Sequence, residues 1–335
     1  MLRFLLRRLA WAIPTLALIS LVVFLLLDLA PGDPLSQLPL TIPPEVREKM
    51  RTALGADQPM MVRYLLWLRQ LLVAEPLHLL DRLTGAGLAG DTPRLLSWQS
   101  RAPVADIIAE RLPQTLTVIG GGYLLGVLIA LPLGIWQARW PRGWIDRLGG
   151  FAMLLGLALP TFVTGLLLIL VFSVELGWLP SIYDTTLRVS DGENLARQLR
   201  QMAMPVAVLA LYNAAQISRY MRSAMIDTLG QDYIRTARAK GLIEPVVVLV
   251  HGLRNALIPV VAVIALGIPG VFAGAIVTEQ VFRVNGIGQL LISALQAHDL
   301  PMVQTLVFVF AVLIVLCNLL ADLACAMLDP RIRHG

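Results

Sequence analysis

The sequence predicts an all-α protein that crosses a membrane several times. Of its 335 residues, 57% are hydrophobic and 15% are charged, whereas soluble domains carry near 25% charged residues. A helix needs roughly 20 apolar residues to cross about 30 Å of hydrocarbon. Six runs approach that length with few charges: residues 9–29, 116–136, 148–176, 202–218, 256–281 and 302–328.

The first run begins after Arg7 and Arg8 and continues to about residue 29. It is longer than the apolar core of a secretory signal, and the LDLAPGDP segment at its end is a poor small-residue cleavage site. We therefore expect an uncleaved transmembrane helix rather than a signal peptide.

The fourth run, residues 202–218, is the shortest, and it carries Asn213 and Gln216. Polar helix at membrane depth is tolerated where it faces protein or a water-filled path. We therefore retain this run as a transmembrane helix. We also predict that Asn213 and Gln216 face a pore or a second subunit.

Arginines gather in alternate connections between the runs. They crowd the N-terminus, the turn at 139–147, the segment at 219–255 and the C-terminus, whereas the connections between these mix acids with bases. By the positive-inside rule, the basic connections and both termini are cytoplasmic. The net charge of +5 then reflects membrane topology, and we expect no nucleic-acid partner.

This orientation divides the chain into four parts. Residues 1–30 hold the cytoplasmic N-terminus and the first span, and residues 31–112 form an external helical segment. Residues 113–328 form the core of five further spans with the cytoplasmic loop 219–255, and 329–335 end the chain in the cytoplasm. Capping patterns predict short external helices in PPEVREKMRTALG and QPMMVRYLLWLRQLL, and no element is assigned over 73–100.

No pattern for catalysis or metal binding is present in the sequence. A phosphate-binding loop is excluded because neither of the two lysines, Lys49 and Lys240, precedes a serine or threonine. The four histidines lack metal-ligand spacing. We expect a chain that is not an enzyme and that binds no metal or cofactor.

Two acids lie within predicted spans, Asp28 near the external end of the first and Asp322 near the cytoplasmic end of the last. A charge at membrane depth is costly, so both should face protein or water. Asn318 and the terminal Arg331 or Arg333 are nearby candidate partners for Asp322.

The loop between the fourth and fifth runs predicts two helices outside the membrane. Helix-forming residues cover 226–240 with Gly230 as the interruption, and Gly241 provides a C-terminal turn. Pro245 can begin a second helix with Val246, Leu249 and Val250 on one side. Small residues at 236, 237, 239 and 241 allow another surface to approach closely, which indicates a docking site for a cytoplasmic partner.

The stretch YIRTARAKGL followed by LRNALIPVV resembles the cytoplasmic loop of permease subunits of ABC importers, in the dipeptide and oligopeptide permease family. The resemblance extends over most of the chain, through LAPGDP, RLPQTL, the VTEQVF segment and the final LDPRIR. Asn285 stands where the family usually has proline and His298 where it usually has arginine, and the segment 72–100 departs further.

The resemblance implies a type I ABC importer permease fold in the bacterial inner membrane. It also implies a second homologous permease subunit that completes the pore, with a heterodimer expected and a homodimer as the open alternative. Two ATPase subunits that use ATP and Mg²⁺ and an external solute-binding protein complete the implied assembly. Asn213, Gln216 and Glu279 are candidate pore or subunit contacts. The residues that would dock on the ATPase subunits are Tyr233, Arg235, Thr236, Ala237, Arg238, Ala239, Lys240 and Gly241.

Two other functions remain as alternatives. In a secondary carrier driven by an ion gradient, Asp28 and Asp322 would be the coupling sites. An accessory subunit would anchor a complex without transporting. The solute stays open, because related permeases serve dipeptides, longer peptides, glutathione, nickel chelates and some sugars.

Overall fold

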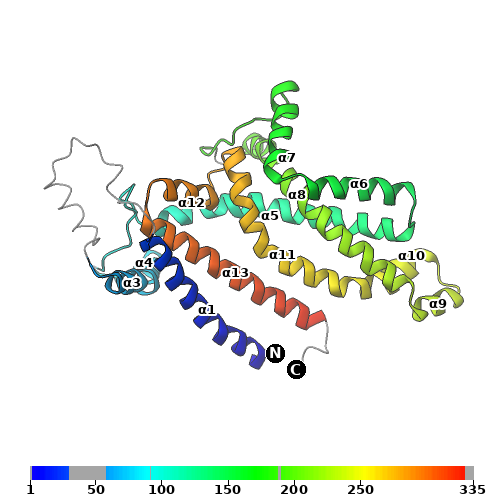
Figure 1. Cartoon of the computed structure of the whole chain (residues 1–335), viewed down its shortest axis with the longest axis horizontal. Coiled ribbons are helices and arrows are strands. Elements are labelled where there is room, and N and C mark those ends of the chain that lie inside the picture. The colour runs from blue at the N-terminus through cyan, green and yellow to red at the C-terminus, as the bar shows by residue number, and fades with distance from the viewer. Residues whose placement is uncertain (1, 30–57, 91, 188–189, 329–335) are drawn as a thin grey trace. The chain divides into compact units, whose positions relative to one another are not determined.

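The computed structural model describes residues 2–29, 58–90, 92–187 and 190–328 (Figure 1). Within these residues the secondary structure is helical, apart from a single antiparallel bridge between Leu96 and Pro103, so the all-α prediction is confirmed. The α-helices are α1 (Leu2–Leu29), α3 (Met60–Arg69), α4 (Glu75–Thr84), α5 (Val104–Arg139), α6 (Trp144–Ala158), α7 (Thr161–Leu168), α8 (Gly192–Leu229), α9 (Asp232–Ala239), α10 (Glu244–Val246), α11 (Leu253–Phe282), α12 (Ile287–Gln296) and α13 (Leu300–Leu328). Three π-helical segments are continuous with them: η1 (Gln70–Ala74) between α3 and α4, η2 (Ile169–Glu175) after α7, and η3 (Val247–Gly252) between α10 and α11.

Among the described residues, four helical stretches are long and apolar enough to cross a membrane. They are Leu6–Leu29, Val104–Arg139, Glu244–Ile268 and Leu300–Leu323. The bent pair Trp144–Ala158 and Thr161–Glu175 makes a fifth if it counts as one span. The predicted span at 202–218 lies inside α8, a continuous helix whose composition is too polar to place it in this group.

The helix expected over 148–176 is broken in the structure. Its two halves, α6 and the α7–η2 pair, meet at an angle of 106°. Leu159 adopts an extended backbone conformation (φ −85°, ψ 124°) directly before Pro160. A proline disfavours helical geometry in the residue before it, so the apolar run predicts the length of the segment and misses its bend.

The segment 73–100, left unassigned from the sequence, begins with a further helix. The helix predicted from Pro59 is confirmed as α3, and it continues through η1 into α4. Pro76 suggests a helix boundary, but the wider π-helical turn before it accommodates a residue that has no N–H. The chain leaves α4 at Gly85 in a left-handed conformation (φ +67°). The helix predicted in PPEVREKMRTALG lies outside the described residues.

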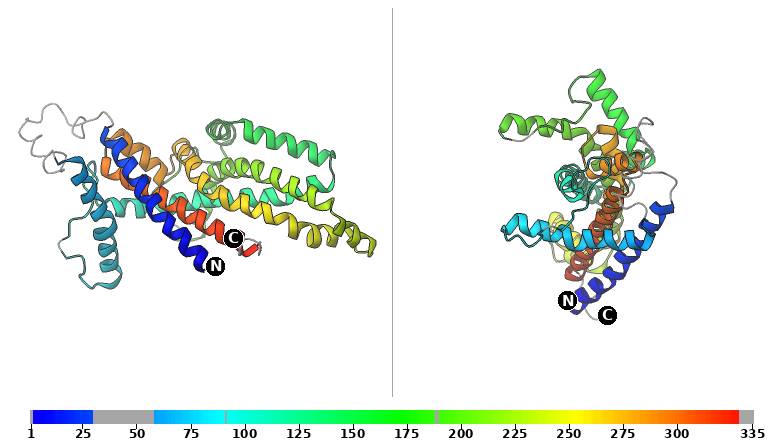
Figure 2. Two further views of the ribbon diagram at one scale, coloured as in Figure 1. Left: turned by 60° about the horizontal axis from the view of Figure 1, so that its bottom comes forward. Right: turned by 90° about the vertical axis from the view of Figure 1, so that its left-hand side faces the viewer.

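The chain forms two compact units. Unit 1 comprises Met1–Arg8, Gln114–Gly288 and Leu313–Gly335, and unit 2 comprises Leu9–Pro113 and Gln289–Val312. In unit 1, α8 runs beside α6 and α11, and α7 contacts both α8 and α11 (Figures 1 and 2). Met221 and Met225 of α8 are fully buried there against Val248, Ala256 and Val260.

Glycines of α5 bring its backbone close to α8. A Cβ at Gly134 would lie 2.6 Å from Cβ of Met221 and 2.8 Å from the carbonyl oxygen of Ser218. A Cβ at Gly126 would lie 2.9 Å from Cβ of Asn213. In lipid, where helices gain little from the hydrophobic effect, such close backbone packing supplies much of the attraction between them.

Buried Glu279 clamps the turn that follows α11. Its Oε1 accepts a hydrogen bond from Thr115 Oγ1 (2.6 Å), and the same Oγ1 accepts one from the backbone N–H of Ile287 (2.8 Å). Gly286 and Gly288 press against the Glu279 carboxylate so closely that a side chain on either would displace it. The clamp joins α5, α11 and α12.

In unit 2, the α3–α4 helix crosses α1 (Figure 2). Phe24 of α1 packs on Tyr64 and Trp67 of α3, with ring centroids 5.3 and 6.3 Å away. Trp67 also meets Phe308 edge to face at 5.9 Å. These buried rings give the unit a core of its own.

Buried Asp299 joins the 97–100 turn to the start of α13 in unit 2. Its carboxylate accepts hydrogen bonds from Ser97 Oγ and from the backbone N–H groups of Trp98 (3.0 Å) and Gln99 (3.4 Å). It also accepts from the N–H of Met302 (3.3 Å), as an N-cap residue does.

Both acids in the predicted spans have basic partners. Asp28 pairs with Arg63, and Asp322 Oδ2 lies 3.0 Å from Arg8 Nη1. Within the described residues the basic partner of Asp322 is therefore an arginine of the first helix, and the expected partners Arg331 and Arg333 lie outside these residues. Local sequence could not show this pair because it joins opposite ends of the chain.

The close approach of α5 to α8 can be tested by adding one methyl group. Gly134→Ala should destabilise the protein by about 1–3 kcal/mol, because the new Cβ meets a backbone carbonyl that cannot move by itself. We expect a lower melting temperature in detergent. The control is Gly120→Ala on the same helix, where a Cβ would have nothing within 4 Å. Equal melting temperatures for the two variants would refute the close contact.

Candidate functional site

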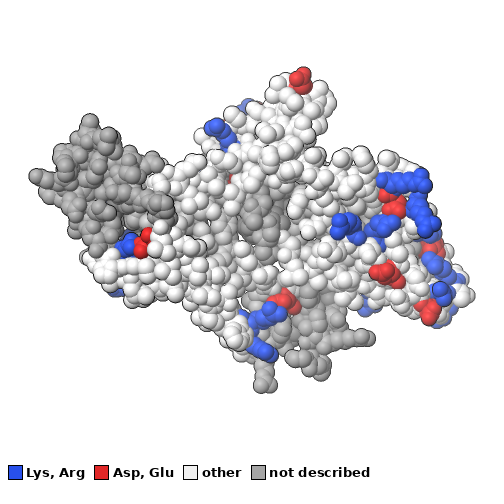
Figure 3. Space-filling view, in the orientation of Figure 1, with Lys and Arg blue, Asp and Glu red and all other residues white. Residues whose placement is uncertain are grey.

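The loop between α8 and α11, residues 230–252, folds as a compact helical hairpin in unit 1. α9 leads into a turn at Gly241, and α10 with η3 returns to α11. Charged side chains gather at the end of unit 1 that carries α9 and α10 (Figure 3). The predicted helix, turn, helix order is confirmed, except that Gly230 ends α8 and separates it from α9.

The hairpin has a small apolar core. Ile234 and Ala237 of α9 pack against Val247, with Leu229 at the edge of the cluster. Ala237 was expected to contact a partner protein. It is instead buried within its own chain, because it shares the inward face of α9 with Ile234.

The return segment of the hairpin buries two of its valines. Val247 and Val248 are buried, whereas Leu249 and Val250 are exposed. The return segment is π-helical over Val247–Gly252, so its side chains do not recur at the 3.6-residue spacing of an α-helix.

Gly241 makes the turn possible. Its φ is +78°, a left-handed conformation that glycine adopts without the steric cost of a Cβ. Its N–H bonds to the carbonyl of Arg238 (2.9 Å), and a Cβ at this position would have nothing within 4 Å. Gly241 therefore sets the backbone path and leaves open space above it.

Glu244 ties the two arms of the hairpin together. It accepts two hydrogen bonds from the Arg238 guanidinium, from Nη2 at 2.9 Å and from Nε at 3.2 Å. The bond to Glu244 raises the pKa of Arg238 further above neutrality. Arg139 at the end of α5 lies 3.5 Å from the same carboxylate and stacks over the ring of Trp140 at 5.6 Å. This network links the hairpin to the α5–α6 turn.

Two further contacts hold this end of unit 1. Asn255 Nδ2 donates to the hydroxyl of Tyr233 (3.0 Å), which joins α9 to α11. Arg222 of α8 forms a bidentate pair with Asp146 of α6, at 2.7 and 2.8 Å. Bidentate arginine–carboxylate pairs fix orientation as well as distance.

The outer surface of the hairpin stays uncovered by the described residues. Tyr233 is 43% exposed and Ile243 67% exposed. Thr236 Oγ1 donates to the carbonyl of Asp232 (3.0 Å), and Arg235 pairs with Asp232 at 3.2 Å. The predicted docking residues that lie on this surface are Tyr233, Arg235, Thr236, Arg238, Ala239, Lys240 and Gly241.

The three candidate pore or subunit contacts separate in the structure. Gln216 is exposed on α8, and its contact with a pore or a second subunit stays a prediction. Asn213 is buried against α5, and its Nδ2 donates to the carbonyl of Leu209 (2.7 Å). Glu279 is buried in the clamp with Thr115. Asn213 and Glu279 are therefore structural residues of this chain, because their polar atoms bond within it.

Sequence reasoning missed Glu244, Arg139, Asn255 and the Arg222–Asp146 pair. The opposite charges of Arg238 and Glu244, on either side of the Gly241 turn, are the signal in the sequence that could have found this pair. The other contacts join helices far apart in the chain and leave no local pattern. Among the described residues no three His, Cys, Asp or Glu side chains come together as metal ligands.

Comparisons with known proteins identify the family. Residues 130–334 match the model of the binding-protein-dependent transport system inner membrane component, and residues 1–119 match that of its N-terminal region. The oligopeptide transport system permease protein AppB of Bacillus subtilis (strain 168) is 36% identical over 335 residues, with 99% of each chain covered. The glutathione transport system permease protein GsiC of Escherichia coli (strain K12) is 37% identical over 338 residues, with 100% of each covered.

A solved structure supports the fold alone. It is the crystal structure of an amino acid ABC transporter with histidines, with a TM-score of 0.52 and 14% identity. The match covers 67% of this chain and 94% of that one. None of these relatives is a secondary carrier. The chain therefore belongs to the family of binding-protein-dependent transport system inner membrane components, and it is a multi-pass permease subunit of an ABC importer.

Proposed function

We propose that this permease carries peptides or closely related small solutes, and that the 230–252 hairpin docks on a cytoplasmic ATPase subunit. The solute class is supported by full-length similarity to permeases named for oligopeptide and glutathione transport. The docking role is supported by a hairpin whose inner side is fastened and whose outer side is open.

The docking proposal rests on this pairing of a fastened inner side and an open outer side in the hairpin. A loop that transmits force must be rigid, and the small core, the Arg238–Glu244 pair and the Tyr233–Asn255 bond hold this one on three sides. The open space above Gly241 and the exposed side chains of Leu242 and Ile243 leave room for a close apolar contact. Exposed charges alone contribute about 0–1 kcal/mol each, too little to hold a motor subunit.

The proposed importer contains further subunits beside this chain. A second permease subunit would contact the exposed side chain of Gln216 and complete the pore as a heterodimer. Two ATPase subunits bind ATP and Mg²⁺, so this chain needs no cofactor or catalytic residue. The basic hairpin and both termini lie in the cytoplasm by the positive-inside rule. The segment 31–112 is external, where a solute-binding protein delivers its cargo.

Uptake by reconstituted vesicles tests the transport proposal. Vesicles holding this permease with its partner subunits and binding protein should accumulate a labelled dipeptide when ATP is supplied on the ATPase side. A protonophore should leave the initial rate unchanged. Uptake that stops with the protonophore, or that proceeds without ATP, would contradict an ATP-driven importer. Competition by glutathione and by longer peptides would define the solute class.

Docking can be tested on the exposed side of α9. Ala239→Trp places a large ring on the outer surface of the hairpin, where it should block the ATPase subunit and reduce its co-purification at least tenfold. The fold should survive, since Ala239 is exposed and helical. The matched control is Ala196→Trp, at an exposed position near the N-terminal end of α8. With this control variant the ATPase subunit should co-purify normally. Normal co-purification of Ala239→Trp would remove the hairpin from the interface.

The Glu244 network predicts a smaller effect that charge exchange can reverse. Glu244→Arg separates the arms of the hairpin by repelling Arg238 and Arg139, and it should weaken ATPase co-purification several-fold. The exchange Arg238→Glu with Glu244→Arg restores the pair and should recover part of the loss. An effect of a few-fold fits an exposed ion pair of about 1 kcal/mol. If the double exchange is no better than the single variant, the pair does not hold the hairpin.

A further inference from the structure

Unit 2 contains a cavity of about 460 Å³ between α1, α3, the 93–101 segment and the start of α13. Its volume falls within the range of small-molecule sites. Among the described residues Arg63, Arg94 and Arg101 line it, whereas no aspartate or glutamate does. The lining therefore presents three guanidinium groups to the interior.

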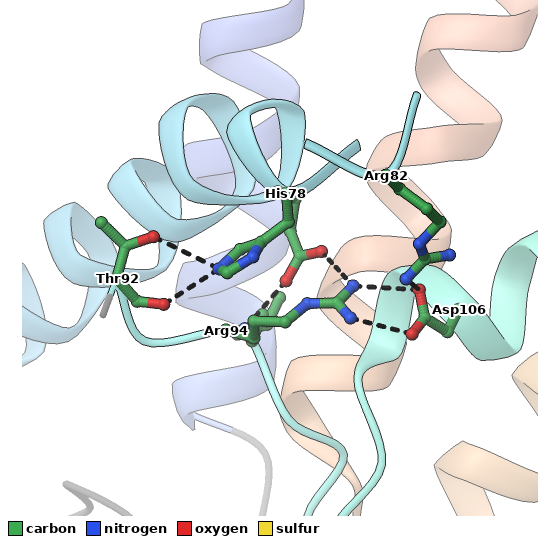
Figure 4. Close-up of polar contacts among 7 residues, drawn as sticks. His78, Arg82, Thr92, Arg94 and Asp106 are labelled. Carbon is green, nitrogen blue, oxygen red and sulfur yellow. Dashed lines mark hydrogen bonds and ion pairs between the residues drawn. The ribbon is translucent and has the colours of Figure 1, made fainter. Parts of the chain in front are cut away.

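Carboxylates behind the wall hold two of these guanidinium groups in place. Arg94 bonds through Nη1 to Asp106 (2.8 Å) and through Nη2 to Glu75 (2.7 Å), while Arg82 reaches the other side of Asp106 at 2.8 Å (Figure 4). Hydrogen bonding to Asp106 and Glu75 raises the pKa of Arg94, so its charge persists at any physiological pH. Arg63 is held in the same manner by Asp28.

The wall keeps hydrogen-bond donors that the protein does not use. The Nε–H groups of Arg63 and Arg94 are buried without an acceptor. Within the described residues the Arg101 side chain has no hydrogen bond or ion pair, and its backbone is held in a left-handed conformation (φ 59°) at the tip of the 97–103 turn. Unused buried donors beside fixed guanidinium groups suit an oxyanion, which accepts several N–H bonds at once.

Two tryptophans give the cavity an apolar side. Trp67 is buried in the aromatic core and Trp98 is partly buried beside Arg101, and both line the cavity. A ligand that fits this lining carries a negative group and an apolar body. Sites of this composition take small amphipathic molecules, since a few polar groups orient a largely apolar ligand.

We propose that this cavity binds the carboxylate or phosphate group of a small amphipathic molecule, with Arg63, Arg94 and Arg101 as its charged wall. The oxyanion sits against the guanidinium groups and the apolar body against Trp67 and Trp98. The site is separate from the ATPase-docking hairpin, and its test needs neither transport nor ATP. The same chemistry serves a carboxylate solute and the headgroup of an anionic phospholipid.

Calorimetric titration of the purified, assembled importer tests the proposal with two matched pairs of probes. N-acetyl-phenylalanine is compared with its uncharged amide, and dihexanoyl phosphatidylglycerol with the zwitterionic dihexanoyl phosphatidylcholine. We expect one acidic member to bind and its matched partner to bind at least tenfold more weakly. Preference for the first acid identifies a carboxylate solute, and preference for the second identifies a lipid headgroup. Binding of neither acid, or equal binding within both pairs, overturns the proposal.

Variants then locate the binding. Arg101→Gln removes a charged group that supports no contact in the described fold, and it should weaken binding about tenfold, the loss of one charge-assisted hydrogen bond. Gln70→Glu adds a negative charge to the wall and should also weaken binding. Arg69→Gln is the matched control, because Arg69 precedes Gln70 in the same continuous helix, is exposed and does not line the cavity. This variant should bind the probe normally. Equal losses in Arg69→Gln and Arg101→Gln would show a surface charge effect and refute the site.

Discussion

The arrangement of unit 1 depends on covering α8. This helix is 38 residues long and carries more polar residues than lipid tolerates, including Asn213 and Ser218 at its middle. A polar helix at membrane depth must be surrounded by protein, because hydrocarbon offers no hydrogen-bond partners. The glycines of α5 and the apolar faces of α6 and α11 meet this requirement, and the buried polar groups of α8 bond to its own carbonyls.

Buried acidic side chains supply hydrogen-bond acceptors at the turns. Backbone N–H groups that leave a helix or a ladder still require acceptors when they are buried. Asp299 provides these for the 97–100 turn, Glu75 accepts the N–H of Leu95 (3.0 Å), and Glu279 acts through Thr115 on the N–H of Ile287. Each carboxylate is an acceptor with several lone pairs, so one side chain can close a whole turn. The turns at residues 95–100 and 283–287 are thereby fastened by buried side-chain acceptors.

Sequence patterns predicted the features that arise locally. Apolar runs located α1, α5 and α13, and the Gly241–Pro245 spacing predicted the hairpin between α8 and α11. The break at Leu159 and the π-helical segments were missed, because hydropathy reports burial and not the path of the backbone. The burial of Ala237 was missed for a different reason. A small residue suits both a partner interface and a tight internal core, and the position of Val247 decides between them.

Rigidity explains how a hairpin of this size can act on a long helix. At 1.5 Å per residue, α8 extends about 57 Å without a break. About two turns before its end, α8 is tied to α6 through Arg222 and Asp146. The hairpin that follows is tied to α5 and α11 through Glu244 and Asn255. If α9 docks as proposed, a displacement applied there reaches α5 and α11 through these pairs and through the apolar core of the hairpin. Movement of these helices together would be a rigid-body change of the kind by which packed elements change state.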